Sequence, residues 1–346
     1  MEWIFVFISG ATLLVYSAER LIDSLVGAAS GLKISLFLLA IVFTGIEFDD
    51  IVLGVALELE EVEGVALGLV LGTAVAFSGV VLALGAILAP TKMNVPRDYI
   101  VIFAAAPLIM LVFALAEPIS IAEGVVLIGL FALFIAYVTV REVKRETPTF
   151  RNLEVLDEVA ELEGEGQAPA PDRKEAVAAM MPFGTGLKHP GWPSLGMAVV
   201  ALAGIVIGAA TVSTGTEGIL EEYGLEGTLF GATIITAVLT IEDLFLTVEP
   251  IRRGVPEIGV GNVIGSLVFT VTGKLGIIVI AGGSITVASN VLKWHLPALV
   301  AITAIAACVL YSGQLKRSHG YALLGLYIAY WVISYSVYGG APVEAD

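Results

Sequence analysis

The stretch TGIEFDD at Thr44–Asp50 places three carboxylates between two apolar runs, and TIED at Thr240–Asp243 places two more in similar surroundings. Asp50 and Asp243 are 193 positions apart. An ionised carboxylate at the centre of a bilayer costs several kcal/mol. Five of them inside apolar sequence therefore indicate a wet or ion-filled cavity rather than ordinary packing.

The surroundings of the two motifs repeat at the same offset. Residues Ser35–Phe77 align with Thr228–Thr270 without a gap. Within this alignment GLVLGT at Gly68–Thr73 falls on GNVIGS at Gly261–Ser266. Glycines four apart let two helix backbones approach closely. Their recurrence beside a hydroxyl residue in both copies predicts a pair of homologous helix–helix units.

The composition is that of a polytopic membrane protein. Of the 346 residues 58% are hydrophobic and 14% charged, and the mean hydropathy is +0.95. Soluble domains carry about 25% charged residues. Met1-Glu2-Trp3 has no basic region, which predicts insertion without a cleaved signal peptide. A net charge of −16 argues against a nucleic-acid partner.

The apolar runs predict an all-α integral membrane fold with ten transmembrane helices. The expected spans are 3–29, 34–57, 64–89, 99–116, 121–140, 195–213, 227–250, 257–283, 291–312 and 320–338. Three regions follow. Residues 1–140 form a first five-helix repeat with its motif in 34–89, residues 141–193 an acidic linker, and residues 194–346 a second five-helix repeat with its motif in 227–283.

The charges of the loops predict the orientation. Odd-numbered loops are the basic ones, and they carry Lys33, Lys92, Arg97, the basic residues of the 141–193 linker, Arg252, Arg253, Lys316 and Arg317. Even-numbered loops are acidic, with Lys293 as their clear exception. The positive-inside rule then predicts a cell-membrane protein with both termini outside and the linker in the cytoplasm. The acidic linker is interpreted as a solvated hinge, with a cation-sensing loop as the alternative.

The topology of the repeats indicates a transporter. Five spans separate the copies, and an odd number gives them opposite polarity in the membrane. Inverted repeats place a substrate site near the bilayer midplane, where the two halves meet. This favours a transporter over a receptor or a membrane enzyme, and no zinc motif or nucleophile constellation supports an enzyme.

The candidate cation ligands are the polar residues that recur at the repeat offset. They are Glu47, Asp49, Asp50, Thr73, Thr240, Glu242, Asp243 and Ser266. Helical spacing predicts that Glu47 and Asp50 share a face, which Thr240 and Asp243 repeat. Asp49 and Glu242 lie about 100° away, towards a neighbouring helix or a proton path. Such oxygen ligands suit Ca²⁺, Na⁺ or H⁺.

At these residues the chain resembles the Ca²⁺/cation antiporter superfamily, which includes the Na⁺/Ca²⁺ exchangers. That family has ten helices and two inverted repeats. Each repeat carries Gly-Thr-Ser-x-Pro-Glu, followed by Gly-Asn-x-x-Gly-Ser-Asn on the next helix. Gly261–Ser266 keeps the second motif nearly whole. The spacing of the family places its motif glutamate on Asp50 and Asp243.

Several positions depart from the family pattern. The motif serine is replaced by Glu47 and Thr240. The polar ligand of the second helix falls on Phe77 in one copy and on Thr270 in the other, so the resemblance implies that one ligand is lost and one weakened. An antiporter site is expected to persist, with an ion selectivity that the family does not fix.

Lys274 lies one turn beyond Thr270, inside the eighth expected span. Two interpretations remain open. It forms an internal ion pair with a site carboxylate and substitutes for a bound cation in part of the cycle, or it extends towards the membrane interface.

The predicted function is secondary cation antiport. The leading hypothesis is exchange of Ca²⁺, or a similar cation, for Na⁺ or H⁺ by alternating access, with the transported cations as ligands and no cofactor. The alternatives are Na⁺/H⁺ or other monovalent-cation/H⁺ antiport and, from another class, a passive cation channel. Because protons and cations share carboxylates, they are expected to compete. The expected partners are inorganic cations and the lipid bilayer, and the oligomeric state is left open.

Overall fold

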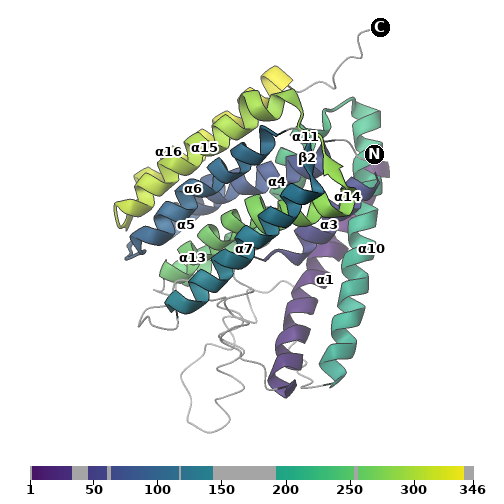
Figure 1. Cartoon of the computed structure of the whole chain (residues 1–346), viewed down its shortest axis with the longest axis horizontal. Helices are drawn as coiled ribbons and strands as arrows, with labels where there is room; N and C mark the ends of the chain where they lie inside the picture. The colour runs from purple at the N-terminus through teal and green to yellow at the C-terminus, as the bar shows by residue number, and fades with distance from the viewer. Residues whose placement is uncertain are drawn as a thin grey trace.

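The structure, a computed structural model, is a bundle of long helices with two small strand pairs (Figure 1). It describes residues 2–32, 46–60, 64–116, 118–142, 192–252 and 256–338. Most of the acidic linker and the beginning of the second expected span lie outside these residues.

The elements of the first part of the chain, with η denoting a π-helical segment, are α1 (Glu2–Leu32), α3 (Phe48–Leu59), α4 (Val65–Ala76), η1 (Phe77–Val81), α5 (Leu82–Leu88), β1 (Thr91–Lys92), α6 (Arg97–Ala114), β2 (Ile119–Ser120) and α7 (Ile121–Glu142). The elements of the second part are α10 (Trp192–Tyr223), α11 (Gly227–Phe230), η3 (Gly231–Ile235), α12 (Thr236–Arg252), α13 (Pro256–Phe269), η4 (Thr270–Lys274), α14 (Leu275–Gly282), β3 (Ser284–Ile285), η5 (Val291–His295), α15 (Leu296–Tyr311), β4 (Gln314–Leu315) and α16 (Arg317–Tyr338).

Seven helices of the described part are long and apolar enough to cross a membrane. They are Val65–Leu88, Arg97–Ala114, Ile121–Arg141, Gly196–Tyr223, Pro256–Gly282, Val291–Tyr311 and Arg317–Val337. A further pair, Gly227–Ile241 and Asp243–Arg252, is bent by 57° and makes an eighth span if counted as one. The helix expected over 195–213 is longer than predicted and ends at Tyr223. A total of ten spans stays a prediction.

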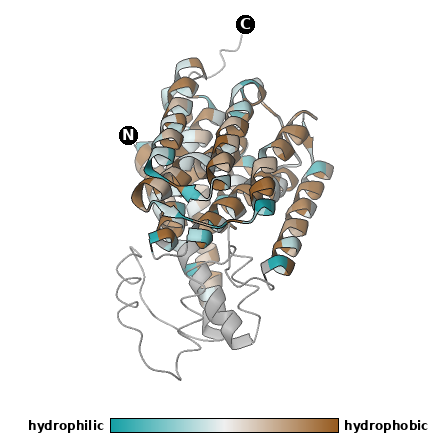
Figure 2. Ribbon diagram, turned by 90° about the vertical axis from the view of Figure 1, so that its left-hand side faces the viewer, coloured by the Kyte–Doolittle hydropathy of each residue, from teal (hydrophilic) through white to brown (hydrophobic). Residues whose placement is uncertain are grey.

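Two spans form the centre of the bundle. The apolar windows of Val65–Leu88 and Pro256–Gly282 are 94% and 89% buried, whereas that of Ile121–Arg141 is only 22% buried. Large apolar side chains such as Leu133 and Val199 are exposed on the outer helices, and Figure 2 shows hydrophobic colouring along these outer surfaces. Exposed apolar faces around a packed centre are those of a multi-pass membrane protein, whose outer surface meets lipid tails.

Helices α1 and α10 pack along each other at one side of the bundle (Figure 1). Small residues allow the close approach. A Cβ added at Gly208 would lie 2.7 Å from the backbone nitrogen of Leu14, and one added at Gly215 would lie 2.7 Å from that of Phe7. Side chains at these positions would force the two backbones apart.

Structural features recur at the offset found in the sequence. The π-helical segment η1 begins at Phe77 and η4 begins at Thr270, which is 193 positions later. The strand pairs are also related between the two halves of the chain. β1 pairs antiparallel with β4, and β2 pairs antiparallel with β3. Exchanging the two halves of the chain turns one strand pair into the other. These correspondences agree with a two-fold relation between the repeats, whose inverted arrangement in the membrane stays a prediction.

The first glycine pair of the repeat packs against the other half of the chain. A Cβ at Gly68 would lie 2.2 Å from the carbonyl oxygen of Thr228, and one at Gly72 would lie 2.5 Å from Cα of Ala232. The backbone of α4 therefore touches that of α11 and η3. This contact confirms the interpretation of Gly68 and Gly72 as close-packing residues.

Candidate functional site

The carboxylates of the first motif lie where helix α3 begins. Glu47 is the N-cap residue, with an extended backbone (φ −94°, ψ 96°), and Asp49 and Asp50 belong to the first turn. The helix expected over 34–57 is therefore not continuous through this motif, because Glu47 precedes α3. Carboxylates in this first turn lie at the positive end of the helix dipole.

Glu47 and Asp50 nevertheless meet at one group, the ammonium of Lys274. Its Nζ lies 2.7 Å from Oε2 of Glu47 and 2.5 Å from Oδ2 of Asp50. The lysine side chain is completely buried, and that of Asp50 is 4% exposed. Of the two interpretations of Lys274, the internal ion pair is therefore confirmed and the interfacial one is wrong. The charge of Lys274 lies among the carboxylates of the opposite half of the chain.

Thr73 adds a hydroxyl to this group. Its Oγ1 lies 3.3 Å from Oδ2 of Asp50 and 2.8 Å from the carbonyl oxygen of Leu69. Only one of these oxygens receives the hydroxyl proton at a time. The first half of the candidate site, which we call the lysine half, therefore consists of Glu47, Asp50, Thr73 and Lys274.

The second half of the candidate site, which we call the hydroxyl half, contains the residues that correspond in the other repeat. Thr240 and Asp243 lie on α12, Ser266 lies on α13, and Thr270 begins η4. All four side chains are buried. The hydroxyls of Thr240, Ser266 and Thr270 have no hydrogen-bond partner among the described residues. Buried polar atoms are usually satisfied, so three unpartnered hydroxyls in matching motifs point to a ligand.

Of the remaining predicted ligands, Asp49 has a side chain that the structure describes, whereas Glu242 does not. The side chain of Asp49 is buried. The side chain of Glu242 lies outside the described part of the structure, although its backbone falls where the helix pair bends by 57°. Among the described residues, no three acidic, histidine or cysteine side chains are grouped as they would be around a resident metal ion.

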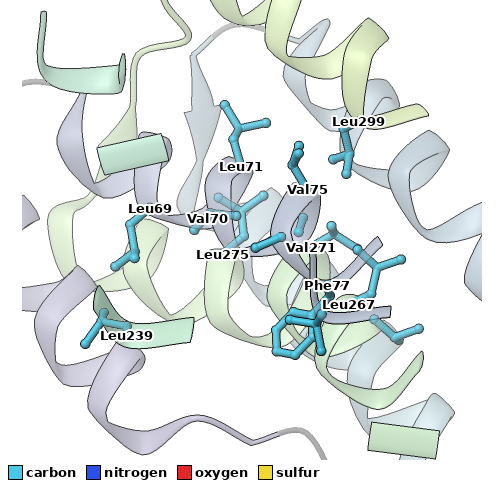
Figure 3. Close-up of a cluster of buried hydrophobic side chains, with 14 of the residues drawn as sticks. Leu69, Val70, Leu71, Val75, Phe77, Leu239, Leu267, Val271, Leu275 and Leu299 are labelled. Atoms are coloured by element: carbon cyan, nitrogen blue, oxygen red, sulfur yellow. The ribbon is translucent and has the colours of Figure 1, made fainter. Parts of the chain in front are cut away.

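Phe77 occupies a position where the family has a polar ligand, and it is an apolar core residue. Its side chain is fully buried in the cluster drawn in Figure 3, beside Leu267 of α13. Its counterpart at the repeat offset is Thr270. The two halves of the site therefore differ in chemistry although they occupy equivalent places in the repeats.

One polar contact near the site is not predicted by the sequence analysis. Asn262 Nδ2 donates a hydrogen bond of 3.3 Å to the hydroxyl of Thr247, linking α13 to α12. Asn262 belongs to the GNVIGS motif, so this motif could have identified Asn262 as a candidate polar residue. For Lys274 the signal was a single ammonium within the apolar span Pro256–Gly282.

Comparison with known proteins decides the family. A model of the sodium/calcium exchanger protein family matches residues 2–140 and 193–336, which is most of the chain on both sides of the linker. The chain belongs to the sodium/calcium exchanger family. The resemblance inferred from the motifs is thus confirmed, and membership makes the protein a cation antiporter of the membrane rather than an enzyme.

The similar proteins include both named exchangers and less specific membrane proteins. Inner membrane protein YrbG of Escherichia coli strain K12 is 25% identical over 340 residues, covering 95% of each chain. Sodium/calcium exchanger MaX1 of Methanosarcina acetivorans is 29% identical over 143 residues, covering 40% of each. The solved structure of the sodium-calcium exchanger NCX_Mj soaked with Na⁺ and Ca²⁺ has a TM-score of 0.57 at 18% identity, covering 97% of this chain and 98% of that one. This likeness shows the fold.

Proposed function

We propose that the protein exchanges Ca²⁺, or a similar cation, for Na⁺ or H⁺ by alternating access at a midplane site made of the lysine half and the hydroxyl half. The observation that carries the proposal is the set of buried, unpartnered hydroxyls on α12, α13 and η4. Their oxygens are hard ligands of the kind that alkali and alkaline-earth cations prefer. Asp243 supplies a buried carboxylate on the same helix as Thr240.

The way the two halves meet supports a single site between the repeats. Lys274 crosses from the second repeat to Glu47 and Asp50 of the first. From the first repeat, Gly72 of α4 packs against η3 of the second repeat. Binding regions formed where two inverted repeats meet can open alternately to either side. The family's pattern further suggests that the α1–α10 pair moves across this core during the cycle.

A second candidate, exchange of a monovalent cation for H⁺, is favoured by Lys274 and Phe77. An ammonium already neutralises part of the carboxylate charge, and the phenylalanine replaces a polar ligand. Ca²⁺ prefers about six to eight oxygen ligands, and its affinity rises with the charge of those ligands. Fewer free oxygens and less net charge weaken a divalent ion more than a monovalent one.

The membrane topology belongs to the same proposal. We place both termini outside and the 141–193 linker in the cytoplasm, in a chain of ten spans arranged as two inverted five-helix repeats. The basic odd-numbered loops support this orientation. Residues 1–140 then contribute Glu47, Asp50 and Thr73, and residues 194–346 contribute Lys274 and the hydroxyl half.

Flux in proteoliposomes tests the proposed exchange. Purified protein would be reconstituted with Na⁺ inside, and uptake of Ca²⁺ would be followed with and without that Na⁺, and again with a proton gradient in its place. An antiporter requires the opposing ion. Cation uptake that proceeds down its own gradient without any exchanging ion would instead identify a passive channel.

A further inference from the structure

Among the differences between the two halves of the site is a positive charge that the repeat does not preserve. Lys274 is the last residue of η4, and the residue at the same place in η1 is Val81. Helix α14, which follows Lys274, packs on α3, and α5, which follows Val81, packs on α12. The lysine half therefore receives a cation from the opposite repeat, whereas the hydroxyl half receives a valine at the corresponding position.

The geometry around Lys274 is that of a filled cation position. Its Nζ lies 2.5 Å from an oxygen of Asp50 and 2.7 Å from an oxygen of Glu47. The ammonium makes charge-assisted hydrogen bonds to both carboxylates, so it supplies the positive charge that a bound cation would otherwise supply. The chain covalently supplies this charge, and the two carboxylates cannot surround a transported ion while the ammonium lies between them.

The hydroxyl half differs from the lysine half in how many of its oxygens lack a hydrogen-bond partner. The hydroxyls of Thr240, Ser266 and Thr270 are buried and have no hydrogen-bond partner in the described part of the chain. In the lysine half, by contrast, Thr73 has two acceptors within reach. One oxygen of that half, Oε1 of Glu47, is also unpartnered. Three buried, unpartnered hydroxyl oxygens therefore belong to the hydroxyl half, against one buried, unpartnered carboxylate oxygen in the lysine half.

We infer that Lys274 is a built-in cation that permanently fills one ion position of the site. The exchanged cation then binds in the hydroxyl half. As a result, the protein binds one positive charge fewer than its carboxylates would hold without the lysine. The inference rests on the proposed function and refines it. In this inference, Lys274 determines both which ion is chosen and how much charge is moved in each cycle. Of the two candidate functions, exchange of a monovalent cation such as Na⁺ for H⁺ is then favoured, because the remaining ligands suit a hard cation of low charge better than Ca²⁺.

Removing the lysine charge tests the inference. In Lys274→Gln the position between Glu47 and Asp50 is vacant, and an added cation should occupy it. Equilibrium binding of radioactive Na⁺ and Ca²⁺ to the purified full-length protein should show one additional bound positive charge per chain. Affinity for Ca²⁺ should rise more than tenfold. The matched control is Lys293→Gln, which removes an exposed lysine of η5 and should bind as the wild type does.

A second variant separates charge from loss of the side chain. Lys274→Gln combined with Asp50→Asn removes one positive and one negative charge, so the net charge of the site is unchanged. This double variant should lose the additional bound charge that Lys274→Gln gains. If Lys274→Gln unfolds during purification, millimolar Ca²⁺ or Na⁺ should rescue it, and choline should not.

The possible results separate this inference from the proposed function. Unchanged binding stoichiometry in Lys274→Gln overturns the inference, as does an unfolded Lys274→Gln that neither Ca²⁺ nor Na⁺ rescues. If the wild type exchanges cations and Asp243→Asn does not bind them, the proposed function stands whichever way the lysine variant behaves. If the wild type shows no counter-ion-dependent flux, the proposed function fails, while the binding data still report on Lys274.

Discussion

Replacing Asp50 with asparagine tests the ion pair at the centre of the structure. The substitution keeps the shape of the side chain and removes its charge. Oδ2 of Asp50 lies 2.5 Å from Nζ of Lys274 in a setting from which water is excluded, with side-chain exposures of 4% and 0%. The ammonium then retains Glu47 as its charged partner.

The expected loss of stability follows from these contacts. A hydrogen bond to a charged group contributes about 1.5–3 kcal/mol, whereas removing one partner of a buried ion pair outright costs about 3–5 kcal/mol. Because Glu47 remains and asparagine still offers an acceptor, we expect the free energy of unfolding to fall by about 2–3 kcal/mol. We also expect cation exchange to be lost, because the charge balance of the lysine half is changed.

Asp98→Asn is the matched control for this experiment. Asp98 also accepts a 2.7 Å ion pair, from Arg141, but the two side chains are 27% and 52% exposed. Exposed pairs contribute about 0–1 kcal/mol. Unfolding titrations in mixed micelles and flux in proteoliposomes would be measured for both variants. An Asp50→Asn protein that is no less stable than Asp98→Asn, or that exchanges cations normally, would refute the assigned role of the Lys274 pair.

Three further predictions concern packing, the lost ligand and topology. Gly72→Val should prevent accumulation of folded protein, because a Cβ at this position would lie within 2.5 Å of Ala232 backbone atoms. The control Gly129→Ala, in open space on α7, should fold normally, and size-exclusion chromatography would distinguish the two variants. Phe77→Asn should lower stability by about 3 kcal/mol or more without raising cation affinity in binding assays, because it removes a fully buried ring and leaves a buried amide. Tags at both termini should be accessible from outside intact cells, and cleavage of the 141–193 linker by external protease would reverse the proposed orientation.

Much of the fold follows from local features of the sequence. Apolar runs predict spans because a bilayer requires about 20 apolar residues of helix, and seven such spans are confirmed as helices. The close packing at Gly68 and Gly72 was also predictable, because a small residue on every fourth position marks a helix contact. The π-helical segments that begin at Phe77 and Thr270 are separated by the predicted offset of 193, but nothing in the sequence indicated that these segments would be π-helical.

The site was predictable in its residues but not in its connections. The sequence identified Glu47, Asp50 and Lys274 as charged residues in apolar surroundings. It could not choose between an internal and an interfacial position for the lysine, because that choice depends on a contact between residues more than 200 positions apart. The sequence also predicted one helix over 34–57, whereas α3 begins at Phe48, after Glu47.

Counter-ion-dependent flux through the wild type, Asp50→Asn and Asp243→Asn is the decisive test of antiport at the proposed site. The three proteins would be reconstituted at equal density, and cation uptake would be followed against an opposing gradient of Na⁺ or H⁺ and without one. We expect uptake by the wild type only when the opposing ion is present, and none by either variant. Uptake that needs no opposing ion, or normal exchange by both variants, would contradict it.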